Sequence, residues 1–297
     1  MKAVRTIAEL RNEIQNLKSS NEKKTVGLVP TMGYLHEGHA SLIRAAKEKT
    51  DIVVVSIFVN PIQFGPAEDF ETYPRDEQRD LAAAEKAGAD LVFLPSVETM
   101  YPKATKTKIA VSEVTSGLCG ASRPGHFDGV TTVVAKLFNI VQPDAAFFGM
   151  KDAQQVAVIQ QMVYDLNFNV NIVPCPIIRE EDGLALSSRN VYLSPEERKQ
   201  ALVLSRSLRE AKEALENGQI RTAGEAKAFL TAKIMESPLA DIDYVEVAAF
   251  PALTPLAEGE NVLEQNGAVL MALAVKFGRT RLIDNSLLHP KGELRHV

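Results

Sequence analysis

The sequence has few cysteines, no long apolar run and no cluster of basic residues. Its 297 residues include two cysteines, Cys119 and Cys175, which stand far apart. Neither a disulfide framework nor a cysteine zinc site can be built from them, and we expect both to be buried as small apolar side chains. The longest apolar stretch, Ile52 to Val59, is interrupted by Ser56. It is far shorter than the roughly 18 to 20 residues that a membrane-spanning helix needs.

The charge balance argues against a nucleic-acid partner. The chain has 33 Lys and Arg against 38 Asp and Glu, a formal net charge of −5. A mildly acidic chain without a run of Lys or Arg offers no large footprint for a phosphate backbone, although a local basic pocket can still bind a small anion. The first fifteen residues mix charged and apolar side chains and lack the apolar core of a secretory signal. We therefore expect a cytoplasmic protein that binds neither nucleic acid nor membranes.

Strand-like and helix-like segments alternate in the first part of the chain. Short β-branched runs at Thr25 to Val29 and Ile52 to Val59 flank a helical segment from Ala40 to Lys49, and together they predict a βαβ unit. The alternation continues through strands near 90–94 and 145–148 and helices near 76–87, 129–141 and 152–165. This order predicts an α/β fold with a Rossmann-like, doubly wound parallel sheet. Ligands of such sheets bind beyond the carboxyl ends of the strands.

The two ends of the chain differ from this pattern. Thr6 and Glu9 are placed as a capping box, which predicts a helix at the start. Beyond Pro176 a long helix is expected from Ser194, a second helix from Thr222, and strands at 242–247, 267–277 and 281–284. The length exceeds the usual range of about 100 to 200 residues for one domain. We therefore expect a Rossmann-like domain over residues 1–178 and a smaller α+β domain over residues 179–297.

The sharpest motif is the turn from Pro30 to His39, between the first buried strand and the following helix. His36 and His39 stand three residues apart at a helix N-terminus, where backbone N–H groups and the helix dipole favour phosphate. Glycine allows close approach of a ligand, and imidazoles can donate hydrogen bonds to a phosphate oxygen as negative charge builds there. One structural and one exposed histidine is the alternative. The i, i+3 spacing does not fit the His-Glu-x-x-His motif of zinc proteases.

Other motifs for phosphate binding or catalysis fail on inspection. Gly120 to Phe127 has the glycine spacing of a P-loop, but His126 and Phe127 occupy the places of its lysine and Ser/Thr. Gly-x-Gly-x-x-Gly and Gly-x-Ser-x-Gly do not occur in the sequence, so a nicotinamide dehydrogenase and a serine hydrolase lose their main support. The run from Ser187 to Arg189 can grip phosphate oxygens, although such a run is more often a solvated turn.

Together these segments resemble the pantothenate synthetase family, the pantoate–β-alanine ligases, within the nucleotidyltransferase superfamily that carries His-x-Gly-His. The similar segments are Pro30 to His39, Ser56 to Gly65, Tyr73 to Arg75, Arg123 to Phe127, Phe148 to Asp152 with Gln154 and Gln155, and Leu186 to Asn190. They follow one another in the expected order over the first two thirds of the chain. The C-terminal third adds little to the resemblance.

The resemblance implies a two-step reaction without a protein nucleophile. The pantoate carboxylate would attack the α-phosphorus of ATP and release pyrophosphate, and the amine of β-alanine would then displace AMP from pantoyl adenylate to give pantothenate. Positioning and charge stabilisation would therefore carry catalysis. Residues 1–178 would bind the nucleotide and pantoate, and residues 179–297 would form a lid. ATP would be a substrate, and the resemblance suggests a homodimer.

Mg²⁺ is implied by the triphosphate, since this ion usually binds through substrate phosphates and one or two carboxylates. Its protein ligand is unknown from the sequence. Asp80 is a candidate, although a solvated helix residue is the simpler interpretation.

The resemblance also assigns residues to roles. His39 would be the proton donor, with His36 and Lys151 beside it on the phosphates, while Gln63, Gln155 and Asn60 would bind pantoate or β-alanine. The ATP site would comprise Met32, Gly33, Tyr34, Leu35, His36, Glu37, Gly38, His39, Gly149, Met150, Lys151, Asp152, Ile178, Leu186, Ser187, Ser188 and Arg189. Without the resemblance, both glutamines would be taken for solvated residues and Asp152 for a helix cap.

Other functions share parts of this pattern. A nucleotidyltransferase acting on another small acceptor is the first alternative. An aminoacyl-tRNA synthetase fits less well, because the chain is short and acidic. A non-catalytic nucleotide-binding module could have the same sheet and the same turn, since a fold does not fix a function.

Overall fold

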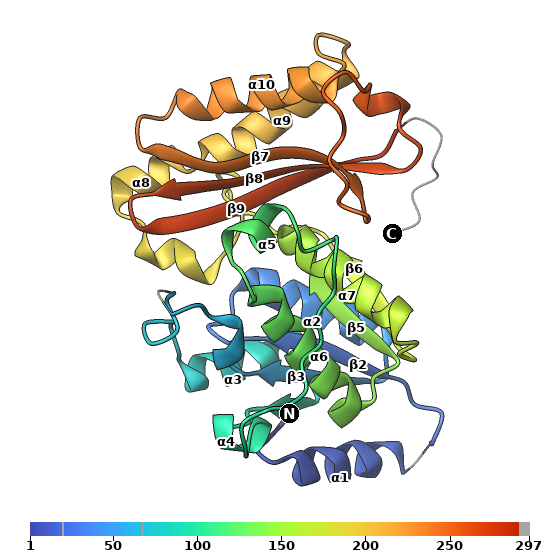
Figure 1. Ribbon diagram of the computed structural model, residues 1–297. Helices are drawn as coiled ribbons and strands as arrows, with labels where there is room; N and C mark the ends of the chain where they lie inside the picture. The colour runs from blue at the N-terminus through green and yellow to red at the C-terminus, as the bar shows by residue number, and fades with distance from the viewer. Residues whose placement is uncertain (20, 67, 291–297) are drawn as a thin grey trace. The chain divides into compact units, whose positions relative to one another are not determined.

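The computed structural model describes residues 1–19, 21–66 and 68–290, which fold into two compact units (Figure 1). The first unit comprises residues 1–112, 123–150 and 158–176, and the second comprises the rest of the described chain. These units do not correspond to a division of the chain at residue 178 alone, because the short segments 113–122 and 151–157 also belong to the second unit. The division of the chain into independent domains at residue 178 stays a prediction.

A six-stranded parallel sheet with the order β1-β4-β3-β2-β5-β6 forms the centre of the first unit. In chain order its strands are β1 (Lys2–Val4), β2 (Val26–Thr31), β3 (Ile52–Ile57), β4 (Leu91–Phe93), β5 (Ala145–Gly149) and β6 (Asn171–Cys175). This arrangement confirms the predicted α/β fold with a Rossmann-like, doubly wound sheet. The strand order reverses between β2 and β5, so the loops that follow these two strands diverge at the carboxyl edge of the sheet.

Helices cover the parallel sheet (Figure 1). They are α1 (Ile7–Lys18), α2 (Glu37–Lys49), α3 (Glu77–Ala87), α4 (Val97–Met100), α6 (His126–Val141) and α7 (Ala153–Asp165), whose first residues belong to the second unit. The pair α2 and α3 and the pair α1 and α6 are each in mutual contact. Crossovers between parallel strands are right-handed almost without exception, so the β2–α2–β3 and β3–α3–β4 units place α2 and α3 on one face of the sheet. Cover on both faces explains why five successive residues of β3, from Ile52 to Ser56, are all buried.

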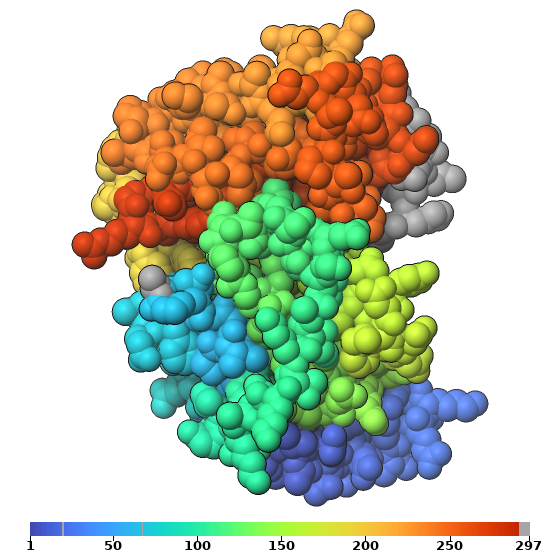
Figure 2. All heavy atoms as spheres, in the orientation of Figure 1, coloured from blue at the N-terminus to red at the C-terminus, as the bar shows by residue number. Residues whose placement is uncertain are grey.

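A long connection follows α4 and runs along the surface of the first unit. Residues 102–108 are exposed, and Figure 2 shows this teal-to-green stretch on the facing side of the molecule. Its far end is tied to α6, because the Ile109 N–H donates to Thr132 Oγ1 at 3.2 Å and Thr131 Oγ1 donates to the Ile109 carbonyl at 2.6 Å. Its near end begins at Tyr101, which is half-buried.

The second unit is an antiparallel sheet with the order β7-β8-β9, packed against helices. Its larger elements are α9 (Val203–Glu216), α10 (Ala223–Met235), β7 (Ala240–Phe250), β8 (Ala268–Phe277) and β9 (Thr280–Leu288). The short helices of this unit are α5 (Leu118–Ser122) and α8 (Pro195–Gln200). The 3₁₀-helices in the described part of both units are η1 (Pro61–Gln63), η2 (Met150–Asp152), η3 (Ser188–Tyr192) and η4 (Val262–Glu264). This confirms the expected smaller α+β part.

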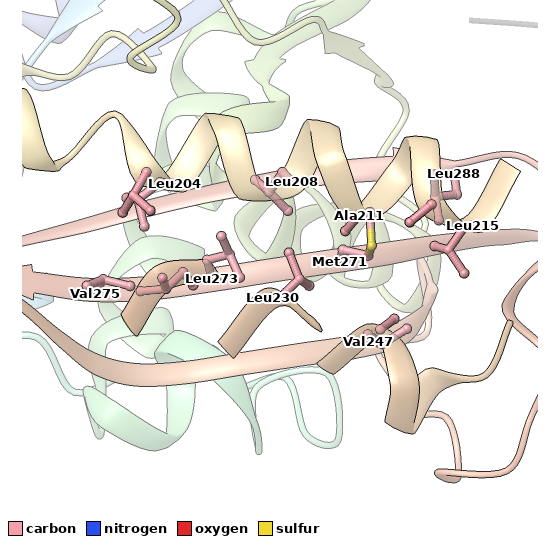
Figure 3. Close-up of a cluster of buried hydrophobic side chains, with 14 of the residues drawn as sticks. Leu204, Leu208, Ala211, Leu215, Leu230, Val247, Met271, Leu273, Val275 and Leu288 are labelled. Carbon is pink, nitrogen blue, oxygen red and sulfur yellow. The ribbon is translucent and has the colours of Figure 1, made fainter. Parts of the chain in front are cut away.

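One apolar cluster holds the second unit together (Figure 3). Its labelled members on α9 are Leu204, Leu208, Ala211 and Leu215, and on β8 they are Met271, Leu273 and Val275. The first set recurs every three or four residues and the second every two. These are the spacings at which a helix and a strand each present one face, so the two elements bury their apolar sides against each other.

The elements differ from the sequence-based expectations in two ways. The long helix expected from Ser194 is two helices, α8 and α9, separated by a turn at residues 201–202. The polar α8 has no buried residue and does not continue the apolar stripe of α9. The short strands β1 and β6 were not predicted. Cys119 and Cys175 are buried free thiols, as predicted.

No helix among residues 1–19, 21–66 and 68–290 is both long enough and apolar enough to cross a lipid bilayer.

Replacement of Leu208 by alanine should lower the free energy of unfolding by about 2 to 5 kcal/mol, because a buried leucine leaves a cavity. Leu208 is 2% exposed. Urea unfolding followed by far-ultraviolet circular dichroism measures this change. Leu239 belongs to the same unit and is 41% exposed, so Leu239→Ala should cost less than about 0.5 kcal/mol. Equal losses in the two variants would contradict the packing of α9 on β8.

Candidate functional site

The two-histidine turn, residues 32–39, joins β2 to α2 at the carboxyl edge of the parallel sheet. Gly33 has a φ of +87°, a left-handed conformation that favours glycine. A Cβ added at Gly33 would lie 2.9 Å from both Asp80 Oδ2 and Ile57 Cγ2. The turn therefore requires glycine at this position for two independent reasons, its backbone conformation and the lack of space.

The buried carboxylate of Asp80 holds the turn in place from α3. Its two oxygens accept hydrogen bonds from the Tyr34 N–H at 2.8 Å and the Leu35 N–H at 2.6 Å. Asp80 is 2% exposed, and this burial raises the pKa of its carboxyl group, although the two backbone N–H groups act in the opposite direction. The interpretation of Asp80 as a solvated helix residue is therefore wrong. Its candidacy as a magnesium ligand stays a prediction, since a carboxylate oxygen that accepts one N–H keeps a second lone pair.

Both histidines cap the N-terminus of α2 through the same ring atom. The Gly38 N–H donates to His36 Nδ1 at 3.1 Å, and the His36 N–H donates to His39 Nδ1 at 3.3 Å. A backbone N–H can only donate, so each Nδ1 must be an acceptor, and each neutral ring then carries its proton on Nε2. The ring centroids are 4.0 Å apart. The turn thus holds two imidazoles whose Nε2 atoms are hydrogen-bond donors.

This geometry differs from the alternative of one structural and one exposed histidine. Both residues are half-buried, and both serve as caps. They lie at the N-terminus of a 13-residue helix, which adds the positive end of the helix dipole to the two N–H donors. The arrangement is therefore suited to an anionic group.

A second group of candidates lies after β3 in the same unit. Gln63 is 8% exposed and Asn60 is 1% exposed, so Gln63 is not a solvated loop residue. Asn60 Nδ2 donates to Gln63 Oε1 at 3.0 Å, and Gln63 Nε2 lies 3.1 Å from Met32 Sδ. The structure therefore brings together Met32 of the two-histidine turn with Gln63 and Asn60, as the sequence predicted for one site.

The backbone of Gln63 is fixed by α6. His126 Nδ1 bonds the Gln63 carbonyl oxygen at 2.8 Å, and the Arg123 guanidinium donates to His126 Nε2 at 3.0 Å. A Cβ added at Gly129 would lie 2.5 Å from Gln63 Cα, so only glycine allows this close packing. Arg123 and His126 thus hold the backbone of Gln63 in place through one chain of hydrogen bonds. The failed P-loop spacing found at 120–127 gave no hint of this support.

The other first-unit candidates follow β5. Gly149 is the last residue of this strand, and Met150 follows it. Both are half-buried, and the nearest atom to a Cβ built on Gly149 is Leu42 Cδ2 at 4.0 Å, so the backbone here is open to a ligand. Since β5 lies beside β2, Gly149 stands at the point where the sheet order reverses.

The remaining candidates belong to the second unit, starting with Lys151 and Asp152 at the start of α7. Asp152 Oδ1 accepts the Gln155 N–H at 3.1 Å, so Asp152 does act as a helix cap. Burial lowers the pKa of the Lys151 ammonium, and the neighbouring Asp152 carboxylate acts in the opposite direction. The side chain of Gln155 is half-buried.

The serine-rich segment forms a compact hairpin with Ile178. The Leu186 N–H donates to the Ile178 carbonyl at 3.0 Å, which brings these two predicted ATP-site residues together. Ser187 caps η3 by accepting the Arg189 N–H at 3.2 Å, and Ser188 is 7% exposed. The segment is therefore not a simple solvated turn.

A cavity of about 550 Å³ also opens beyond β3 and β4 in the first unit. Met32 and Asp80 are among its lining residues, but His36, His39 and Gln63 are not. Its two arginines already have partners, since Arg5 pairs with Glu77 at 2.5 Å and Arg75 donates to the carbonyls of residues 70 and 73 at 2.9 Å. The cavity therefore offers little to a phosphate group.

Comparisons with known proteins show which family this chain resembles. The family model described as pantoate-beta-alanine ligase matches residues 2–287. A pantothenate synthetase of Acetivibrio thermocellus is 57% identical, over 97% of this chain and 99% of that protein. One of Caldicellulosiruptor bescii is 54% identical, over 98% of this chain and all of that protein.

Solved structures agree with these sequence matches. The pantothenate synthetase of Thermus thermophilus is 46% identical with a TM-score of 0.87, over 96% of this chain and 99% of that chain. A pantoate-β-alanine ligase of Francisella tularensis, complexed with β-γ ATP and β-alanine, is 35% identical with a TM-score of 0.78, over 98% of this chain and 100% of that one. These matches confirm the resemblance drawn from the sequence. The chain belongs to the pantoate–β-alanine ligase family and is an ATP-dependent ligase.

Proposed function

We propose that this chain activates pantoate as pantoyl adenylate and transfers the pantoyl group to β-alanine. In the first step a carboxylate oxygen of pantoate bonds to the α-phosphorus of ATP, and the bond to the pyrophosphate oxygen breaks. In the second step the β-alanine amine attacks the acyl carbon, AMP leaves, and the amine loses a proton. The observation that carries this proposal is the capping of α2 by two imidazoles, which makes the Nε2 atom of each ring an N–H donor at the N-terminus of the helix.

His36 and His39 would act on the phosphates of ATP in the first step. Negative charge builds on the oxygen that bridges the α- and β-phosphorus atoms as its bond to the α-phosphorus breaks, and fixed N–H donors lower the energy of this state. His39 would be the proton donor, and His36 its partner. The Nδ1 bonds to the backbone support these roles, because they fix both rings before the substrates bind.

Pantoate would be bound by Gln63 and Gln155. Asn60, which donates a hydrogen bond to Gln63, would belong to the same site. An amide can hydrogen-bond both a hydroxyl and a carboxylate without adding a charge. Gln63 would also meet β-alanine. The burial of Gln63 and Asn60 supports this assignment, since a buried amide keeps a defined direction.

The ATP site would be completed by residues after β5 and by the serine-rich segment, residues 186–189. Met32 to Gly38 and Gly149 to Met150 would line the ATP site in the first unit. In the second unit Asp152 would bind the ribose, Leu186 would contact adenine through its backbone or by apolar packing, and Ile178 would belong to the same nucleotide site. Ser187, Ser188 and Arg189 would contact phosphate. A phosphate oxygen beside Lys151 would favour its charged form, against the effect of burial.

Mg²⁺ would bind mainly through the phosphates of ATP. Among the described residues no group of three or more His, Cys, Asp or Glu could hold a metal ion, so these residues offer no cage of their own. The homodimer and the cytoplasmic location implied by the resemblance stay predictions.

Pyrophosphate-to-ATP isotope exchange tests the first step. The protein should catalyse exchange when pantoate is present and β-alanine is absent, because formation of pantoyl adenylate from ATP is reversible. Omitting pantoate gives the control and should abolish exchange. An active preparation that exchanges only with another acceptor would instead support a different nucleotidyltransferase. ATP binding without any exchange would support a binding module.

The His39→Ala variant should lower kcat by roughly 10² to 10³, as the loss of one transition-state donor does. Its unfolding free energy should fall by only about 0.5 to 1.5 kcal/mol, because a single cap to the His36 N–H is lost. Turnover per folded molecule and urea unfolding separate these effects. His289→Ala, at an exposed position, is the matched control and should change neither. Unchanged turnover in a destabilised His39→Ala protein would make the histidine purely structural.

Removal of divalent metal with a chelator should stop turnover but leave the thermal unfolding of the nucleotide-free protein unchanged. The reason is that the ion would arrive with ATP rather than reside in the protein. Differential scanning calorimetry with and without chelator makes the comparison. A clear drop in the unfolding temperature would reveal a resident metal and contradict this role for Mg²⁺.

A further inference from the structure

We propose that Tyr101 is a positioning residue for pantoate, because its hydroxyl, acting through Asn60, keeps the Gln63 amide turned with its NH₂ group toward the substrate. The inference rests on the proposed binding of pantoate at Gln63. Tyr101 belongs to none of the sequence segments that pointed to the family, and it is 38 residues away from Gln63 along the chain.

The direction of this hydrogen-bond chain is fixed at one end by a backbone carbonyl. Asn60 lies 3.1 Å from the carbonyl oxygen of Gly129, which can only accept, so the Asn60 atom that faces it is Nδ2. The other hydrogen of Nδ2 points to Gln63 at 3.0 Å, and the receiving atom must be Oε1. The free end of the Gln63 amide is therefore the NH₂ group and not the oxygen.

Tyr101 completes the arrangement on the other side of Asn60. Its hydroxyl lies 2.9 Å from Asn60 Oδ1 and must donate, since that oxygen can only accept. Burial raises the pKa of Tyr101 to about 12, so the hydroxyl keeps its proton in the ordinary pH range. With Gly129 and Tyr101 both bonded, Asn60 has one orientation that satisfies every partner.

The Gln63 NH₂ group now faces a weak acceptor. It lies 3.1 Å from the thioether sulfur of Met32, which binds hydrogen less well than oxygen does. A carboxylate or hydroxyl oxygen of the substrate could replace this contact with a stronger one. If the amide turned over, its oxygen would instead face the substrate and would repel a carboxylate oxygen, which can only accept. The chain that starts at the Gly129 carbonyl, and that Tyr101 completes by donating to Asn60 Oδ1, thus selects an acceptor group at this position.

The backbone of Gln63 does not depend on Tyr101. It is held by His126 and by close packing on Gly129, as described above. The ring of Tyr101 packs near Phe58, with centroids 6.0 Å apart, and Lys136 Nζ lies 5.4 Å from its centre. A phenylalanine ring can keep both contacts. Tyr101→Phe therefore removes the hydroxyl while leaving the position of Gln63 Cα unchanged.

The Tyr101→Phe variant should raise the KM for pantoate about three- to tenfold, the factor that one neutral hydrogen bond controls. The KM for ATP and the unfolding temperature should stay close to those of the unaltered protein. Tyr164→Phe removes a hydroxyl from a ring that is 79% exposed and is the matched control. A lowered unfolding temperature with an unchanged pantoate KM would make Tyr101 merely structural, and an equal rise in both KM values would also overturn the proposal.

A double-mutant cycle with Gln63→Ala gives the second readout. If Tyr101 acts through Gln63, then Tyr101→Phe should have no further effect on pantoate use once the Gln63 amide is gone. Additive effects of the two changes on kcat/KM for pantoate would contradict the relay. Failure of the proposed function would look different, because the unaltered protein would then show no pantoate-dependent exchange at all.

Discussion

The hydrogen bonds from the backbone of the two-histidine turn to Asp80 are the constraint on which the first-unit site depends. Asp80 lies on α3 and is far from the turn in sequence, but its carboxylate accepts the N–H groups of Tyr34 and Leu35. Burial of an anion is unfavourable, and these two charge-assisted bonds offset part of that cost. They hold the turn that includes the left-handed Gly33 and leads to α2, which begins at Glu37. The capping positions of His36 and His39 follow from that geometry.

The larger elements could be predicted because their signals are local. Thr6 and Glu9 do form the capping box that opens α1, and the alternation of apolar strands and helices gave the parallel sheet. The three residues of β1 are too few to show a period. Pro174 has no N–H donor, so its presence argued against a strand at β6. The strand lies at the edge of the sheet, where proline is tolerated.

The site could be predicted only where its residues are close in sequence. The two histidines form one short pattern, whereas Asp80 resembled any acidic residue of a charged helix. A signal was present, since Asp80 shares its helix face with the buried Ala84 and Ala87. The contact of Tyr101 with Asn60 spans 41 residues, so no local pattern could reveal it.

The two parts of the first-unit site follow the same physical rule. In each, backbone groups of fixed polarity decide which side-chain atom can donate. The N–H groups of residues 36 and 38 occupy both Nδ1 atoms, and the Gly129 carbonyl orients Asn60 and hence Gln63. In all three side chains, His36, His39 and Gln63, the second polar atom of the ring or amide is consequently an N–H donor. A site that offers donors in this way suits substrates rich in carboxylate and phosphate oxygens without using a full positive charge.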